Sequence, residues 1–182
     1  MHPILKPDDG GSKNCRCRRF VQTSRFFLFF RRENSYGLSS MQTSARNCFS
    51  GKVVALKKGP ILAELELAIG PETSLVSHIA FTSVTELGLA VGSSIYALVK
   101  ASQVILLTDA SSVRLSTQNC FCGTVSTLRP GAVNTEVIIQ IEDNLSLVAI
   151  VTHESATELD LRVGSRVCAA FAPSSVLIAI ET

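Results

Sequence analysis

The chain contains an internal repeat. The stretch Ser44–Gly51, which reads S-A-R-N-C-F-S-G, returns 72 positions later as Ser116–Gly123, S-T-Q-N-C-F-C-G. This offset continues without a gap towards the end of the chain, and roughly a third of the paired positions are identical. Two copies are too few for a stacked solenoid. The sequence therefore predicts two tandem small domains.

The repeat divides the chain into four expected segments. They are a leader over 1–40, a first domain over 41–108, a linker over 109–115 and a second domain over 116–182. A domain of about 70 residues is near the lower limit for burying a core alone, so we expect pairing or oligomerisation. The apolar run in the leader, Phe26–Phe30, is too short to span a bilayer, and no signal-peptide cleavage site follows it. We interpret the leader as a disordered tail or as sequence upstream of the true start.

Charge is unevenly distributed along the chain. Residues 1–40 carry 8 basic and 3 acidic side chains, whereas residues 41–182 carry 9 basic and 12 acidic ones. A mildly acidic repeat pair lacks the basic face that neutralises phosphates. The chain also has no tryptophan for stacking on bases. Nucleic-acid binding is therefore disfavoured.

Cysteine spacing does not indicate a metal site. The six cysteines form two C-x-C pairs and two single residues: Cys15, Cys17, Cys120, Cys122, Cys48 and Cys168. A zinc site needs four ligands at a recognisable spacing, and the three histidines do not complete one. Cys48 and Cys120 match across the repeat and are interpreted as small buried apolar residues. Unpaired cysteines without an export signal predict a reducing cytoplasm.

Apolar residues recur with the period of strands in both copies. Strands are expected over 52–56, 61–67, 75–81, 93–99 and 104–107, and again over 124–128, 133–141, 147–152, 166–171 and 176–180. An S-x-x-E sequence at Ser83 and another at Ser155 predict the start of one short helical turn per copy, and Gly88 predicts the end of the first. The predicted fold class is all-β, with two tandem OB-like small barrels, each of five strands and one helical turn.

Several motifs resemble a known family. The S-A-R-N opening at 44–47, the L-G-L-x-x-G run at 87–92 and the K-A-S sequence at 100–102 are similar to the molybdate-binding (Mop, TOBE-like) domain. A tandem pair resembles a di-domain molbindin, a cytoplasmic family that binds and stores molybdate. This resemblance implies a homotrimer of tandem chains, with molybdate or tungstate held where units meet and on the symmetry axis, and with no redox cofactor and no membrane partner.

The resemblance also implies a set of ligand-binding residues. Molybdate and tungstate are tetrahedral dianions at neutral pH, so their pocket needs hydrogen-bond donors and no carboxylate. The expected oxyanion-binding residues are Ser44, Ala45, Arg46, Thr82, Ser83, Lys100, Ala101 and Ser102 in the first copy, and Ser116, Gln118, Thr152, His153, Ser155 and Ser174 in the second. None of them is acidic.

Each copy keeps a different half of the family motif. The hydroxyl half, V-T-x-x-S, survives only in the second copy at 151–155, because Ala80 replaces its threonine in the first. The basic half, 44–46 with 100–102, survives only in the first copy, because Gln118 replaces the arginine in the second. We therefore expect composite sites in which the basic half of one unit meets the hydroxyl half of another. The sequence leaves open which units meet.

Other interpretations remain. Arg46 and Lys100 are also typical of ordinary solvent-exposed cations. Ser44 and Ser102 are also typical of residues that cap a helix or form a local turn. The same units occur as molybdate-sensing domains of transcription regulators and transport ATPases, although a regulator needs a helix-turn-helix domain that residues 1–40 are too short to supply. A second alternative is an OB-type nucleic-acid-binding module. No nucleophile, base and orienting group occur together, so the sequence predicts that the protein is not an enzyme.

Overall fold

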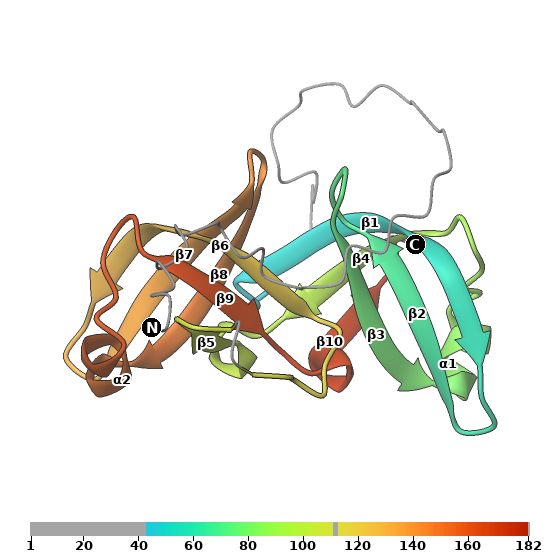
Figure 1. Ribbon diagram of the computed structural model, residues 1–182. Helices are drawn as coiled ribbons and strands as arrows, with labels where there is room; N and C mark the ends of the chain where they lie inside the picture. Colours follow the sequence, from blue (N-terminus) through green and yellow to red (C-terminus); the bar gives the residue numbers. More distant parts are fainter. Residues whose placement is uncertain (1–42, 111–112, 182) are drawn as a thin grey trace, which may run out of the picture.

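The described residues form two curled five-stranded sheets that lie side by side (Figure 1). The computed structural model describes residues 43–110 and 113–181. The first copy contributes β1 (Asn47–Lys58), β2 (Leu62–Ala68), β3 (Ser74–Ala80), β4 (Ser94–Val99) and β5 (Ile105–Leu107). The second contributes β6 (Cys120–Pro130), β7 (Asn134–Glu142), β8 (Leu145–Thr152), β9 (Arg166–Ala170) and β10 (Val176–Ala179). The predicted all-β fold class is confirmed.

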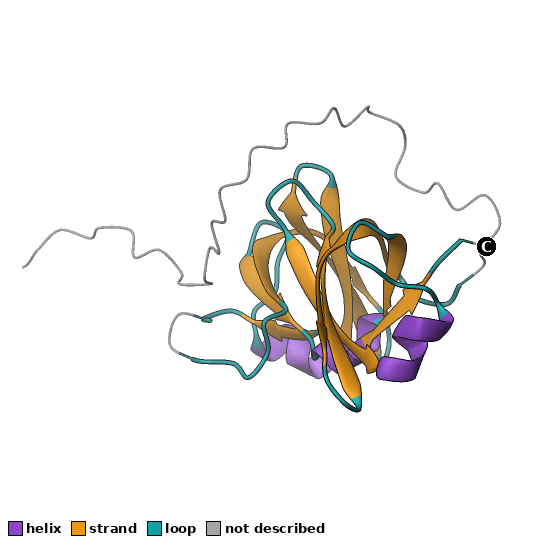
Figure 2. Cartoon of the chain, turned by 90° about the vertical axis from the view of Figure 1, so that its right-hand side faces the viewer, coloured by secondary structure: helices purple, strands orange, loops and turns teal. Residues whose placement is uncertain are grey.

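Short helices accompany the strands at equivalent places in the two copies. A six-residue helix follows the third strand, α1 (Phe81–Glu86) or α2 (His153–Glu158). A 3-10 turn precedes the last strand, η1 (Ala101–Gln103) or η2 (Pro173–Ser175). These helical segments lie at one end of the sheets, at the bottom of Figure 2. Within the described ranges, no helix has the length and apolar character needed to cross a membrane. The expected leader, residues 1–40, lies outside these ranges.

The two copies exchange their last strands. The strand orders are β10-β4-β1-β2-β3 and β5-β9-β6-β7-β8. In the first sheet Val176 lies opposite Val99, and in the second Leu106 lies opposite Ala169. The red strand β10 therefore runs beside the green strand β4 in Figure 1. The fifth strand expected in each copy thus completes the sheet of the other copy, a pairing that strand periodicity does not specify.

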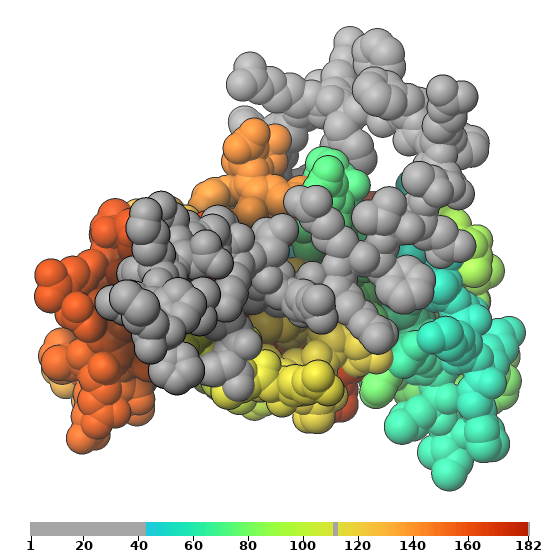
Figure 3. All heavy atoms as spheres, in the orientation of Figure 1, coloured from blue at the N-terminus to red at the C-terminus, as the bar shows by residue number. Residues whose placement is uncertain are grey.

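Period-two alternation fills a core that the two copies share. In β2, Ala63, Leu65 and Leu67 are buried, while the glutamates between them are only partly covered. The exchanged residues Leu106 and Val176 are buried in the same hydrophobic cluster as residues of both copies. The two copies are also packed against each other in the space-filling view (Figure 3). Neither copy therefore has a core of its own.

The first long strand of each copy begins earlier than predicted. β1 starts at Asn47 and not at residue 52, and β6 starts at Cys120 and not at residue 124. The repeated glycine makes this possible, because a Cβ at Gly51 would lie 2.3 Å from the Ala68 carbonyl oxygen. At Gly123 the corresponding distance, to the carbonyl oxygen of Gln140, is 2.1 Å. Only glycine permits so close an approach of two strands.

The helices begin two residues before the predicted S-x-x-E starts. α2 starts at His153, with Thr152 as its N-cap, so the predicted start at Ser155 is wrong. α1 likewise starts at Phe81 and not at Ser83. The N-cap residue is in each case the last residue of the third strand: Thr152 caps α2 with its side chain, whereas Ala80 precedes α1 without a side-chain cap. Gly88 has a φ of 59°, which agrees with the predicted end of the first helical turn.

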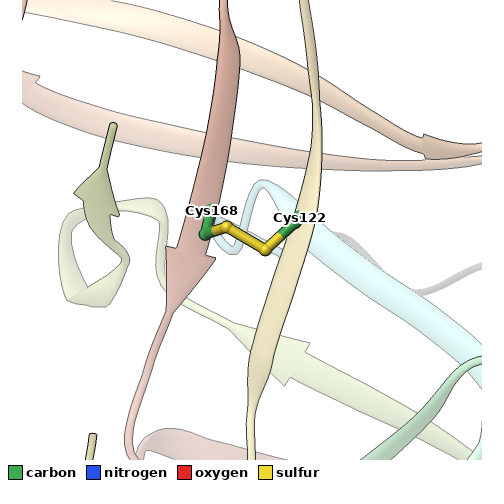
Figure 4. The surroundings of a disulfide bond; sticks show 2 residues. All are labelled: Cys122 and Cys168. Carbon is green, nitrogen blue, oxygen red and sulfur yellow. A yellow bond between two sulfur atoms is a disulfide. The ribbon is translucent and has the colours of Figure 1, made fainter. Parts of the chain in front are cut away.

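One cysteine pair forms a disulfide that the sequence analysis did not predict. Cys122 and Cys168 join β6 to β9 (Figure 4). The two residues lie directly opposite each other, with their Cα atoms 3.9 Å apart. The expectation of unpaired cysteines is wrong here, because strand register brings together residues 46 positions apart. This bridge removes the argument for a reducing cytoplasm that rested on unpaired cysteines.

Candidate functional site

Two buried asparagines join the copies to each other. The side-chain amide of Asn47 donates to the Val148 carbonyl oxygen at 2.8 Å and accepts from the Val148 backbone nitrogen at 2.7 Å. Asn119 makes the equivalent pair of bonds with Val76, both at 2.7 Å. Each amide imitates a peptide group and fastens the start of one copy to the third strand of the other. The sequence analysis noted these repeated asparagines but assigned them no role.

The basic half is assembled by the first copy alone. Asn47 lies opposite Val99 in the β1–β4 ladder, so the residues before Asn47 and those after Val99 leave the sheet side by side. Arg46 and Lys100 are therefore neighbours at one end of the ladder, and both are exposed. Of the other predicted residues here, Ser44 and Ser102 are exposed, Ala45 is half-buried and Ala101 is buried.

This basic half lies beside a strand of the second copy. The Arg46 Nε atom is 4.0 Å from Glu136 Oε2, and Glu136 is opposite Ile150 in the β7–β8 ladder. η1 also packs against β8. Because β8 ends at Thr152, the basic half is placed next to the part of β8 that leads into the hydroxyl half. We call the residues 44–46, 100–102 and 152–155 the first junction.

The hydroxyl half caps helix α2. Thr152 Oγ1 accepts a hydrogen bond from the Ser155 backbone nitrogen at 3.1 Å and donates to Ser155 Oγ at 2.8 Å. Thr152 is exposed and Ser155 is half-buried. The T-x-x-S sequence therefore holds two hydroxyl groups together at the end of β8.

Other predicted residues belong to the equivalent place, where the opening of the second copy meets the third strand of the first. We call the residues 116–118, 172–174 and 80–83 the second junction. The Phe171 backbone nitrogen donates to the Asn119 carbonyl oxygen at 3.1 Å, which sets the two segments beyond this pair next to each other. η2 packs against β3, and Ala80 supplies no side-chain cap to α1. Exposed or half-buried hydroxyl groups are present on Thr82, Ser83, Ser116 and Ser174.

His153 is placed differently from the other predicted residues. It lines a cavity of about 210 Å³ that belongs to the second copy: Leu128, Pro130, Thr135, His153, Ala156, Thr157, Asp160 and Leu161. Its Nδ1 atom is 3.5 Å from Thr135 Oγ1. No other predicted site residue lines this cavity, and the carboxylate of Asp160 would oppose a dianion there. The structure therefore does not bring the ring of His153 together with the basic half.

A carboxylate lies closer to the basic half than the sequence analysis assumed. Glu136 Oε1 accepts a hydrogen bond from Arg129 at 2.8 Å, while its Oε2 faces Arg46. The Arg46 side chain is 65% exposed, so its longer ion pair is screened by water and contributes less than about 1 kcal/mol. Arg46 can consequently turn towards another anion at small cost.

The equivalent carboxylate in the first copy has different partners. Glu64 accepts from Lys57 Nζ at 2.8 Å and lies 3.2 Å from His78 Nε2. The hydrogen bond from Lys57, followed by that from His78, holds the pKa of Glu64 below its ordinary value. Glu64 therefore stays negatively charged at neutral pH.

Comparison with known proteins identifies the family. Two segments of the chain, 43–106 and 115–178, match the family model described as the TOBE domain. The chain belongs to the TOBE domain family. The predicted resemblance to Mop and TOBE-like domains is confirmed.

Named relatives include molybdenum-pterin-binding proteins, molybdenum transport proteins and a transcriptional regulator. The molybdenum transport protein ModE of Herbaspirillum seropedicae is 34% identical over 142 residues, 78% of this chain and 53% of ModE. The molybdenum-pterin-binding protein MopA of Rhodobacter capsulatus is 38% identical over 141 residues, 78% of this chain and 53% of MopA. This chain thus spans about half the length of these two relatives.

Comparison with a solved structure shows that the similarity includes the fold. ModG, described as a cytoplasmic molybdate-binding protein and solved with molybdate bound, is 38% identical with a TM-score of 0.75. The match covers 78% of this chain and 100% of the ModG chain. The arrangement of two curled five-stranded sheets is therefore common to both proteins.

Proposed function

We propose that this TOBE-family chain binds molybdate or tungstate reversibly, as a cytoplasmic, non-catalytic oxyanion-binding and storage protein. The observation that carries the proposal is the first junction, where Arg46 and Lys100 of the first copy lie beside the strand that ends in the hydroxyl pair of Thr152 and Ser155. Two cations and two hydroxyl groups are donors of the kind that a tetrahedral dianion requires. The molybdate bound to ModG and the names of the relatives support the same ligand and compartment.

The proposal includes a homotrimer of tandem chains, with neither nucleic acid nor membrane as a partner. Exposed apolar side chains at equivalent positions of the two copies support contacts with further chains: Ile61 and Val133, Val91 and Val163, and Ile105 and Leu177. A single exposed apolar residue is ordinary, whereas the same exposure at both positions of three repeated pairs favours an interface. Symmetric assembly would place such pairs against one another.

A molybdate-sensing part of a longer regulator is the alternative function. The transcriptional regulator ModE of Yersinia pestis, 33% identical over 141 residues, favours it, and this chain spans 53% of that protein. Both functions need the same oxyanion site. They differ in the response, because a sensor must alter a second domain or partner when the ion binds, whereas a storage protein only retains and releases the ion.

The Lys100→Ala variant tests the proposed ligand. We expect its affinity for molybdate to fall by about 10- to 100-fold, because a charge-assisted hydrogen bond of about 1.5–3 kcal/mol to a dianion is lost. Isothermal titration calorimetry with sodium molybdate measures this change. Lys58→Ala is the matched control, since Lys58 is an exposed lysine at the end of β1 and away from the first junction. Equal affinity and stoichiometry for the wild type and Lys100→Ala would contradict the proposed site.

A further inference from the structure

The two junctions are equivalent in position but not in chemistry. Residues 72 positions apart occupy corresponding places, so each chain has two places where the opening of one copy lies beside the third strand of the other. Asn47 and Asn119 fasten both places in the same way. The backbone framework for an oxyanion site is therefore present twice.

Positive charge is present at only one junction. The first junction has Arg46 and Lys100, and their equivalents at the second are Gln118 and Ala172. The one acidic residue of the first junction, Glu154, is exposed in the first turn of α2. A dianion leaving water loses strong hydration, which neutral donors on an exposed surface replace poorly. The second junction thus lacks the groups that would compensate a dianion for its lost hydration.

The second junction also lacks the threonine that caps the helix at the first. Thr152 caps α2 and shares a hydrogen bond with Ser155, whereas Ala80 leaves α1 without a side-chain cap. The first junction therefore combines two cations with a capped hydroxyl pair, whereas the second offers neutral hydroxyl groups alone, on Thr82, Ser83, Ser116 and Ser174.

The crossed arrangement of the copies produces this inequality. If each copy used its own halves, Arg46 and Lys100 would meet the third strand that ends in Ala80, and the Thr152–Ser155 pair would meet an opening without a cation. Because each copy's opening and 3-10 turn pack on the third strand of the other copy, both cations lie on the side of the Thr152–Ser155 pair and none lies at the second junction.

From this we infer that the chain has one functional oxyanion site, at the first junction, and that the second junction keeps the same framework without binding the ion. This inference rests on the proposed function and makes it more specific. It assigns no ligand role to the residues of the second junction that the sequence analysis had included: Thr82, Ser83, Ser116, Gln118 and Ser174.

Paired substitutions at equivalent positions test the inference. Calorimetry with sodium molybdate is expected to show that Arg46→Gln loses one bound ion per chain, while Gln118→Ala changes neither affinity nor stoichiometry. The triple variant Ala80→Thr, Gln118→Arg and Ala172→Lys is expected to gain one ion per chain. Circular dichroism checks that each variant is folded. If the triple variant does not fold, Gln118→Arg alone, at an exposed position, is expected to add a weaker second binding event.

The possible failures are distinguishable. If Gln118→Ala loses a bound ion, or if Gln118→Arg and the triple variant both leave the stoichiometry unchanged, the one-site inference is wrong, although the protein still binds molybdate. If the wild-type chain binds no molybdate in the same titration, the proposed function itself is wrong. Sodium sulfate in place of molybdate checks that binding reflects more than attraction of any tetrahedral dianion.

Discussion

At the scale of single residues, one repeated motif serves two purposes. In S-A-R-N, the arginine is exposed and available to a ligand, whereas the asparagine that follows it is 2% exposed and bonded to a backbone peptide of the other copy. The asparagine thereby fixes where the arginine lies. Recurrence of the motif alone does not separate these roles, since both residues are polar.

Replacement of Asn47 by alanine tests this structural role. We expect Asn47→Ala to lower the free energy of unfolding by about 2–3 kcal/mol, because the amide and carbonyl groups of Val148 lose their partners in a partly buried position. Urea denaturation followed by circular dichroism measures the change. Asn144→Ala, at an exposed position in the turn between β7 and β8, is the control and should change stability by less than about 0.5 kcal/mol. Equal stability of the two variants would show that Asn47 does not join the copies.

At the scale of secondary-structure elements, binding and folding overlap at α2. Thr152 is both a proposed ligand and the cap of this helix, so Thr152→Ala would cost about 1 kcal/mol of stability even without an effect on the ion. Arg46 and Lys100 are exposed, and their substitution has no such cost. Variants of the basic half are therefore cleaner probes of the site than variants of the hydroxyl half.

The disulfide between β6 and β9 gives a second test at this scale. We expect the double variant Cys122→Ser and Cys168→Ser to be less stable than the oxidised wild type by about 2–4 kcal/mol, since the bridge closes a long loop in the unfolded chain. Thermal unfolding with and without a reducing agent measures this difference. The reductant should destabilise the wild type and a Cys48→Ser control, because both keep the bridge, but should leave the double variant unchanged. A wild type that does not respond to the reductant would show that the bridge contributes little.

At the scale of the whole molecule, strand exchange makes each copy depend on the other. β10 is the last strand of the second copy, yet it completes the sheet of the first copy by pairing with β4. Val176 and Leu106 are buried in the shared core. Removal of β10 at the C-terminus should therefore destabilise β4, which is far from it in the sequence.

Truncation of the chain after Ser175 tests this dependence. We expect hydrogen exchange measured by mass spectrometry to show lost protection in β4, because its backbone groups on one side lose their partner strand. β9 should keep its protection, since it pairs with β5 and β6. Truncation after Ile180, which keeps the whole of β10, is the control. Loss of protection in β9 with β4 unaffected would contradict the exchange.

Local pattern was sufficient to predict much of this protein. Period-two alternation located the strands, the repeat defined two copies, and the motifs separated a basic half around Arg46 from a hydroxyl half around Thr152. These features depend on residues near one another in sequence. The choice of partner strand does not depend on nearby residues. β5 and β10 would show the same alternation of apolar and polar residues in either sheet, and nothing in the sequence near Cys122 indicates that Cys168 lies opposite it. The folded chain was needed to show the exchange, the disulfide and the meeting of Arg46 with the second copy, because strand register and packing between distant segments establish them.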